Sequence, residues 1–124
     1  MPAKPVTDGL VILLLAAALA GCSATPSRSG PDALFGDPPH LWSGQKVLAV
    51  SPQVCAASGE RILRALSFAG VVRNGSYVYG TLMANRAAIK CIAIGDGRTF
   101  VYAAVAGPDR AQVERLRNEI VWRL

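Results

Sequence analysis

Residues 71–106 read VVRNGSYVYGTLMANRAAIKCIAIGDGRTFVYAAVA, a series of apolar runs separated by short turns. Asn74-Gly75 stands between two of these runs, and this dipeptide favours the two-residue turn of a β-hairpin. Turns at Asn85-Arg86 and at residues 95–97 (Gly-Asp-Gly) separate the remaining runs. We therefore predict an antiparallel meander of three long strands, over 77–84, 87–94 and 99–106, with an extra short strand over 71–73.

The segments on both sides of this meander have the pattern of amphipathic helices. Before the meander, residues 46–50 have the length and composition of a strand, and Ser51-Pro52 is typical of a helix start. We expect this helix to run to about Ala69, where a glycine follows. After the meander, Asp109 is expected to cap a second helix. The predicted apolar faces are Cys55, Gly59, Ile62, Leu66 and Ala69 in the first helix, and Val113, Leu116, Ile120 and Leu124 in the second.

Together these elements predict a small α+β domain over residues 46–124, in the order β-α-β-β-β-α. Each helix has an apolar face that must be covered, so we expect a two-layer sandwich with both helices on one face of a mainly antiparallel sheet. The chain has 124 residues, of which 52% are hydrophobic and 17% charged, with a net charge of +5. This composition excludes an acidic disordered tail, a collagen-like repeat and a multidomain enzyme.

The N-terminal region has the features of an export signal. Residues 10–20 read LVILLLAAALA, eleven apolar residues in a row after a polar start. As a helix this run would be about 16 Å long, roughly half of a ~30 Å hydrocarbon core. It is too short to span a membrane and matches the apolar region of a signal peptide.

The four residues Leu19-Ala20-Gly21-Cys22 resemble the lipobox of bacterial lipoproteins. The resemblance implies that residues 1–21 are a signal peptide, that cleavage occurs before Cys22, and that Cys22 carries a diacylglyceryl group. The alternatives are an ordinary cleavage site with an incidental cysteine, or a short uncleaved anchor. Two or three acyl chains hold a protein firmly at a membrane. Position 23 is serine instead of the aspartate linked to inner-membrane retention, which favours the periplasmic face of the outer membrane.

Residues 22–45 are expected to form the lipidated N-terminus and a Pro/Gly/Ser-rich tether. Leu34, Phe35, Leu41 and Trp42 interrupt this polar segment. They either pack back on the domain or form a short segment that binds a partner.

Cys55 and Cys91 both lie on predicted inward faces of an exported domain, where oxidation is expected. We predict a structural disulfide between them. Two buried unpaired thiols and a redox role are the alternatives, although no second cysteine stands close enough in the sequence to resolve a reactive thiol.

No pattern in the sequence indicates an enzyme, a cofactor or a metal. His40 is the only histidine and lies in the predicted tether, so it provides neither a catalytic set nor a zinc shell with the two distant cysteines. Gly95-Asp96-Gly97 is a turn between strands and not a phosphate-binding loop. Nucleic-acid binding is not expected, because no recognition motif is present and the predicted location is the cell envelope.

The aromatic residues provide the candidate interaction surface. Those on the predicted strands either line the face of the sheet that the helices leave open or complete the core under the helices or the tether. Trp122 is expected opposite the apolar stripe of the last helix. The candidate partner surface comprises Phe35, Trp42, Tyr77, Tyr79, Phe100, Tyr102 and Trp122.

Residues 50–120 also loosely resemble small exported bacterial domains of unknown function. The residues that carry this resemblance are Cys55, Ala88-Ile89-Lys90-Cys91 and the run 105–109 (Val-Ala-Gly-Pro-Asp). It implies no activity and no site. The sequence therefore favours a lipid-anchored envelope lipoprotein that acts as a non-enzymatic accessory or partner-binding module, its partner being an envelope protein or a second copy. The alternative is a periplasmic protein that binds a small ligand or exchanges thiols.

Overall fold

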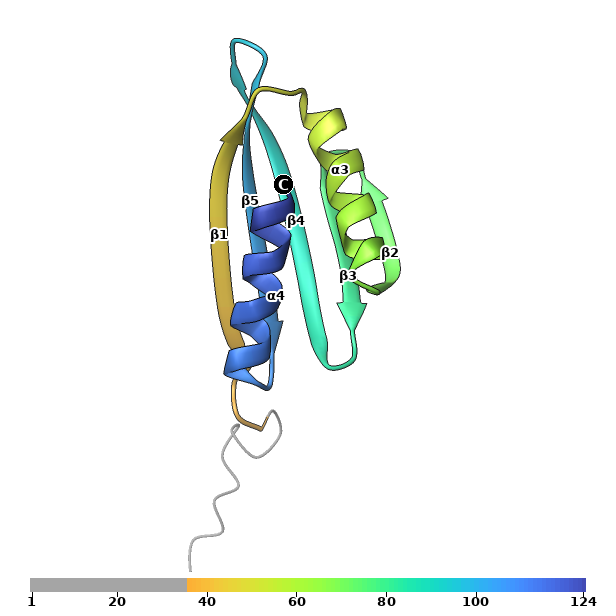
Figure 1. Cartoon of the computed structure of the whole chain (residues 1–124), viewed down its shortest axis with the longest axis vertical. Coiled ribbons are helices and arrows are strands. Elements are labelled where there is room, and N and C mark those ends of the chain that lie inside the picture. The colour runs from red at the N-terminus through yellow and green to blue at the C-terminus, as the bar shows by residue number, and fades with distance from the viewer. Residues whose placement is uncertain (1–35) are drawn as a thin grey trace, which may run out of the picture. The chain divides into compact units, whose positions relative to one another are not determined.

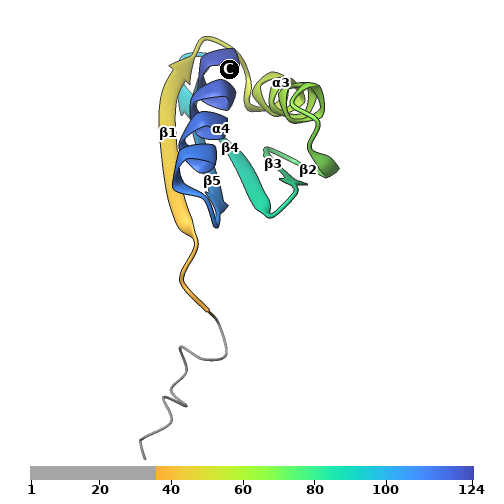
Figure 2. The same cartoon turned by 60° about the horizontal axis from the view of Figure 1, so that its bottom comes forward.

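The computed structural model describes residues 36–124, so the predictions for the signal peptide, for Cys22 and for Phe35 lie outside the described residues. The elements are β1 (His40–Leu48), α3 (Pro52–Ala65), β2 (Ala69–Asn74), β3 (Tyr77–Leu82), β4 (Asn85–Gly95), β5 (Arg98–Gly107) and α4 (Arg110–Arg123). The strands form one antiparallel sheet in the order β1-β5-β4-β3-β2. Both helices lie on the same face of the sheet (Figures 1 and 2). Helix α4 covers β1 and β5, and helix α3 covers β2, β3 and β4. The predicted α+β two-layer fold is confirmed, and the short extra strand is present as β2.

The first strand begins earlier than the sequence predicts, at His40 instead of residue 46. Residues 40–45, expected in the tether, pair with β5 in an unbroken register that runs from His40 opposite Gly107 to Leu48 opposite Thr99. Pro38 and Pro39 end the irregular segment, because strand pairing can begin only where backbone donors are present. Residues 40–45 are only weakly apolar, so their sequence does not predict a strand. This part of β1 is held mainly by its hydrogen-bonded ladder with β5.

The first helix ends four residues before the predicted position. Ser51 caps its start, where its side-chain oxygen accepts a hydrogen bond from the Val54 N–H at 3.3 Å. At its other end, Ser67 adopts a positive φ of 65°. The Phe68 N–H then donates to the Leu63 carbonyl at 2.9 Å, and the Ser67 N–H donates to the Arg64 carbonyl at 3.0 Å. These two bonds are those of a Schellman motif. The motif turns the chain early and directs Phe68 into the core, where it is 5% exposed.

The turn between β3 and β4 also differs from the prediction. It lies at Met83-Ala84, with a positive φ at Met83, and Asn85 is the first residue of β4. Asn85 is 1% exposed, and its Nδ2 donates to the Leu82 carbonyl at 3.2 Å. The asparagine that suggested a turn is therefore a buried residue that holds the preceding turn in place.

The core lies between the sheet and the two helices and is built of small and medium-sized side chains. Within it, α3 approaches β4 closely at Gly59, where an added Cβ would lie 3.1 Å from the Ile89 Cδ1. On β1, an added Cβ at Gly44 would lie 2.8 Å from the Val121 Cγ2 of α4. Both glycines therefore allow a helix to lie near the backbone of the sheet. The buried apolar residues are Cys55, Ala56, Ile62, Leu63, Phe68, Val78, Ala87, Ile89, Cys91, Val101, Ala103, Val105, Val113, Leu116 and Ile120.

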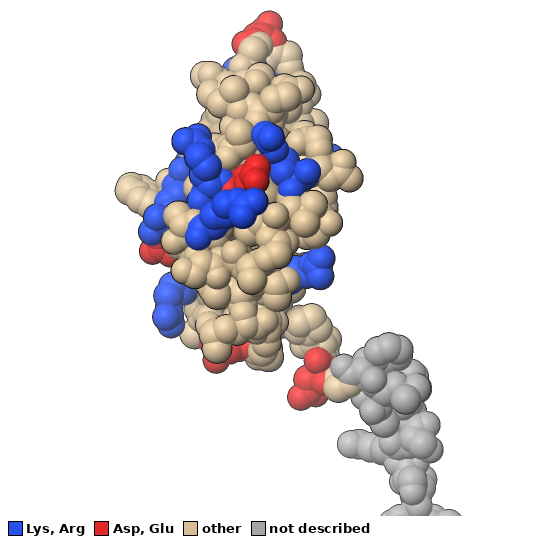
Figure 3. Space-filling model, turned by 90° about the vertical axis from the view of Figure 1, so that its right-hand side faces the viewer, with Lys and Arg blue, Asp and Glu red and all other residues tan. Residues whose placement is uncertain are grey.

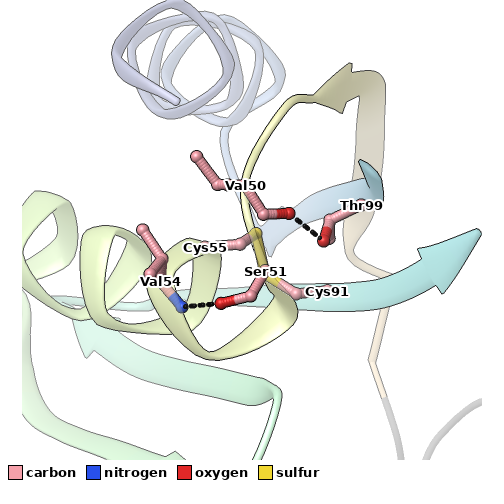
Figure 4. The surroundings of a disulfide bond; sticks show 6 residues. All are labelled: Val50, Ser51, Val54, Cys55, Cys91 and Thr99. Atoms are coloured by element: carbon pink, nitrogen blue, oxygen red, sulfur yellow. Dashed lines mark hydrogen bonds between the residues drawn. A yellow bond between two sulfur atoms is a disulfide. The ribbon is translucent and has the colours of Figure 1, made fainter. Parts of the chain in front are cut away.

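Cys55 and Cys91 form the predicted disulfide, which joins the first turn of α3 to the middle of β4 (Figure 4). Their Cα atoms are 6.1 Å apart, and both residues are buried. Beside the bridge, the Thr99 hydroxyl donates to the Val50 carbonyl at 2.6 Å. The loop that leads from β1 into α3 is thus held by a covalent link on one side and by a hydrogen bond from β5 on the other.

Candidate docking face

The side of the sheet opposite the helices carries an aromatic and aliphatic surface. Side chains alternate between the two faces of each strand, so the register determines which residues share this side. We name it the open face. Its residues are Leu41, Ser43, Gln45 and Val47 on β1; Phe100, Tyr102, Ala104 and Ala106 on β5; Arg86, Ala88, Lys90 and Ile92 on β4; Tyr77, Tyr79 and Thr81 on β3; and Val72 and Asn74 on β2.

Large apolar side chains of the open face are exposed even on strands in the middle of the sheet. Ile92 on β4 is 46% exposed, and Tyr102 on β5 is 39% exposed. At the two sides of the sheet, Val47 and Val72 also stand out from the surface. Scattered apolar residues are normal on a protein surface, whereas a contiguous set marks an interaction site. In the described part of the chain, no element covers this set.

Two tyrosines on β3 are paired with cations on β4. The rings of Tyr77 and Tyr79 lie 5.3 Å apart between centroids. The Arg86 guanidinium lies 5.3 Å from the Tyr79 centroid, and the Lys90 ammonium lies 5.9 Å from that of Tyr77. These are cation–π distances. None of the five strands contains an acidic residue, so the open face is apolar and positively charged.

The predicted surface residues do not all belong to one surface. Tyr77, Tyr79, Phe100 and Tyr102 meet on the open face. Trp42 points to the helix side, where the guanidinium carbons of Arg110 and Arg117 lie 5.4 and 5.6 Å from its ring centroid. Trp122 is 84% exposed on α4, as the helical pattern predicted. The four strand aromatics therefore lie on the face opposite the helices, and the alternative that they complete the core beneath the helices is wrong.

Three open-face residues, Val47, Val72 and Ile92, were not singled out from the sequence, and Leu41 was noted only as an apolar residue of the predicted tether. Leu41, Val47, Val72 and Ile92 are all more than two-fifths exposed, and each lies in phase with an open-face aromatic on its own or a neighbouring strand. Their alternation with inward residues is the signal that identifies them once the register is known.

Two of the cavities in the described part of the molecule bear on a ligand-binding role. The larger, of about 680 Å³, lies beside β4 and is lined by polar and charged groups as well as by backbone. The smaller, of about 240 Å³, lies between α3 and the end of α4. Neither is the deep apolar pocket between helices and sheet that a small-ligand carrier of the usual kind needs. Both cysteines of the disulfide are buried, so an attacking thiolate cannot reach the sulfur atoms easily. This burial disfavours a role in thiol exchange.

Within residues 36–124, no three His, Cys, Asp or Glu side chains gather in a way that could hold a metal ion. In the same range, neither helix has the length and apolar character needed to cross a bilayer. Comparison with known proteins gave no match, whether to a family model, to a curated protein or to a solved structure.

Proposed function

We propose that this protein is a lipid-anchored cell-envelope protein whose folded domain docks a partner protein through the open face. In this proposal residues 1–21 are a signal peptide, Cys22 carries the acyl chains, and the following segment links the lipid to a domain that begins with β1. The lipobox-like Leu19-Ala20-Gly21-Cys22 supports the anchor. The domain then has a binding role and not a catalytic one.

The docking role is carried by one observation, that no element within residues 36–124 covers the centre of the open face. Aromatic side chains provide large contact areas at low entropic cost, and they are enriched at interfaces. Arg86 and Lys90 lie among them without a carboxylate on the same face. The best-fitting partner is therefore an envelope protein with an apolar patch bordered by Asp or Glu. A second copy fits less well, because it would bring the same two cations to the interface with no carboxylate of the open face to pair with them.

Replacing Cys22 with alanine should abolish incorporation of labelled palmitate in growing cells, because the acyl acceptor is removed. Ser23→Ala provides the matched control and should keep the label. Ser23→Asp should keep the label as well and move the protein toward the inner-membrane fraction. Absence of label from the unaltered chain would refute the lipid anchor.

A photoreactive phenylalanine analogue placed at position 102 should form a discrete adduct with one envelope protein in intact cells, identified by mass spectrometry. The same analogue at position 122, on α4, is the matched control and should not form this adduct. In the position-102 protein, Arg86→Glu with Lys90→Glu should reduce the adduct about fivefold or more, because charge complementarity is reversed.

Equal adducts from both positions, or none from position 102, would count against docking on the open face. An adduct with twice the mass of the chain would identify a second copy as the occupant, which would overturn the proposed partner. A preserved melting temperature for each variant shows that the fold is intact.

A further inference from the structure

The sheet has a gap beside β4, because β3 is shorter than its neighbour. The β3–β4 register begins with Tyr77 opposite Lys90, whereas β4 continues to Gly95. The Cys91 N–H donates to the Ser76 carbonyl at 2.9 Å, in the turn before β3. Beyond this bond, residues 92–95 have β5 on one side and no strand on the other.

The 680 Å³ cavity occupies this gap, which we name the β4 notch. Its walls are the first turn of α3, the Gly75-Ser76 turn and residues 91–93 of β4. Main-chain groups alternate between the two sides of a strand, and the Cys91 N–H points toward β3. The N–H and C=O of Ala93 therefore point into the notch. They are positioned as a strand edge to which another strand can bond.

The notch is also positively charged. Arg73 and Lys90 line it, and no acidic residue does. The first turn of α3 contains no acidic residue either. Glu60 lies near this side of the domain, but it is shared between Arg64, at 2.9 Å, and Arg73, at 3.2 Å. Figure 3 shows basic side chains gathered around a small acidic area on the side of the molecule that faces the viewer.

We propose that the β4 notch binds an extended peptide segment with acidic side chains, which adds to β4 as a short strand. Main-chain hydrogen bonds to Ala93 would hold the segment, and its carboxylates would pair with Lys90 and Arg73. Strand addition at an exposed edge is a general mode of peptide recognition. About 13 Å of β4 lies between Cys91 and Gly95 at the usual rise per residue, which accommodates about four residues of the segment.

An anionic membrane surface is the competing occupant, and two observations disfavour it. A lipid headgroup has no peptide main chain, so it cannot pair as a strand with the free edge of β4. In addition, the chain enters the sheet at His40, opposite Gly107, whereas Ala93 pairs with Thr99 near the other end (Figure 1). The notch thus lies at the end of the sheet farther from His40, where the segment that follows Cys22 in the sequence enters the domain. This second argument, unlike the first, rests on the proposed function.

The test uses the full chain in neutral detergent micelles and a fluorescein-labelled pentapeptide, Val-Val-Glu-Glu-Val. Its adjacent glutamates point to opposite sides of the added strand, one toward Lys90 and the other toward Arg73. Fluorescence anisotropy should show saturable binding. Methylating two backbone amides of the peptide should weaken binding about tenfold or more, because it removes strand hydrogen bonds. A lysine–valine peptide should not bind. Equal binding of the methylated peptide, or displacement of the peptide by inorganic phosphate or by phosphatidylglycerol in the micelles, would show a general anion site and overturn strand addition.

Matched variants locate the site. Lys90→Gln should weaken peptide binding about five- to tenfold, whereas Arg86→Gln, which removes a cation–π partner from the same strand and face, should leave it unchanged. Arg73→Gln should weaken binding similarly, whereas Arg64→Gln, which removes the other partner of Glu60, should not. Equal effects within either pair would contradict the site.

The result is separable from the proposed docking and anchoring. Leu41→Glu changes the open face at the end of the sheet away from the notch, and Cys22→Ala removes the acyl acceptor. Neither should alter peptide binding. If the peptide binds while the adduct or palmitate test fails, the notch stands without the proposed function. If it does not bind while those tests succeed, only the notch is refuted.

Discussion

Replacement of Cys55 and Cys91 together with alanine should lower the free energy of unfolding by about 4 kcal/mol, the largest effect that we expect from any change to the core. The bridge spans 36 residues, and a crosslink of this span restricts the unfolded chain by about that amount in the chain-entropy treatment. The loss is severe because the core is built mostly of Val, Ala, Ile and Leu. A domain of this size buries too little apolar surface to replace a lost crosslink easily.

Chemical unfolding followed by circular dichroism measures the effect. The unaltered protein under a phosphine reductant is the matched control, since it loses the crosslink and keeps both sulfur atoms. It should lose nearly as much stability as the double variant, whereas the reductant should leave the double variant unchanged. Coincident unfolding midpoints of the oxidised protein and the double variant would show that the bridge contributes little.

Gly107→Ala should destabilise the domain by about 2 to 3 kcal/mol, the typical cost of forcing an extra group into a well-packed site. A Cβ at this position would overlap the Asn85 Oδ1 and lie 2.9 Å from the Asn85 Cγ and 3.1 Å from the Val113 Cγ2. Asn85 has no room to withdraw, because it is buried and bonded to the Leu82 carbonyl. Its Oδ1 has no conventional hydrogen-bond donor and rests against the Gly107 backbone.

A double-mutant cycle with Asn85→Ala tests this explanation. Removing the amide clears most of the space that the added methyl group needs. The Gly107→Ala change should then cost at least about 1 kcal/mol less than in the unaltered protein, which is the coupling expected for residues in contact. Additive costs for the two changes, measured by the same unfolding assay, would mean that the overlap is relieved elsewhere.

Local signals in the sequence located most of the elements. Ser51 and Asp109 cap the two helices, with the Asp109 carboxylate accepting from the Gln112 N–H at 2.7 Å. The turn that joins β2 and β3 lies at Gly75-Ser76, one residue after the predicted Asn74-Gly75, because Asn74 still pairs with Tyr77. The two cysteines pair as predicted. The caps and the turn depend on residues that are close in sequence. The cysteine pairing was predictable because the local pattern of each element places its cysteine on the inward face, without knowledge of the whole fold.

The departures arise where contacts distant in sequence outweigh local preference. Gly70 predicts a helix end at residue 69, but the chain turns earlier, where Ser67 adopts the left-handed conformation and Phe68 enters the core. Similarly, the polar half of β1 is a strand because β5 offers it a ladder.

The strand sequences alone also do not predict which face of the sheet the helices cover. Tyr77 and Tyr79 are larger than Val78 between them, yet Val78 is the buried residue. α4 approaches β1 closely at Gly44, and α3 approaches β4 closely at its own Gly59, so only small side chains fit between the helices and the sheet. The aromatic residues therefore occupy the other face. Side-chain size alone would have suggested the reverse arrangement.

The position of β1 has a mechanical consequence. β1 is the outermost strand, its first residue is His40, and all nine of its residues pair with β5 without a bulge. If a docked partner holds the sheet while force is transmitted through the segment before His40, the pull runs along the strand axis. Such a load shears the whole ladder at once instead of peeling it one pair at a time. A restrained domain would therefore resist extraction through the combined strength of these bonds.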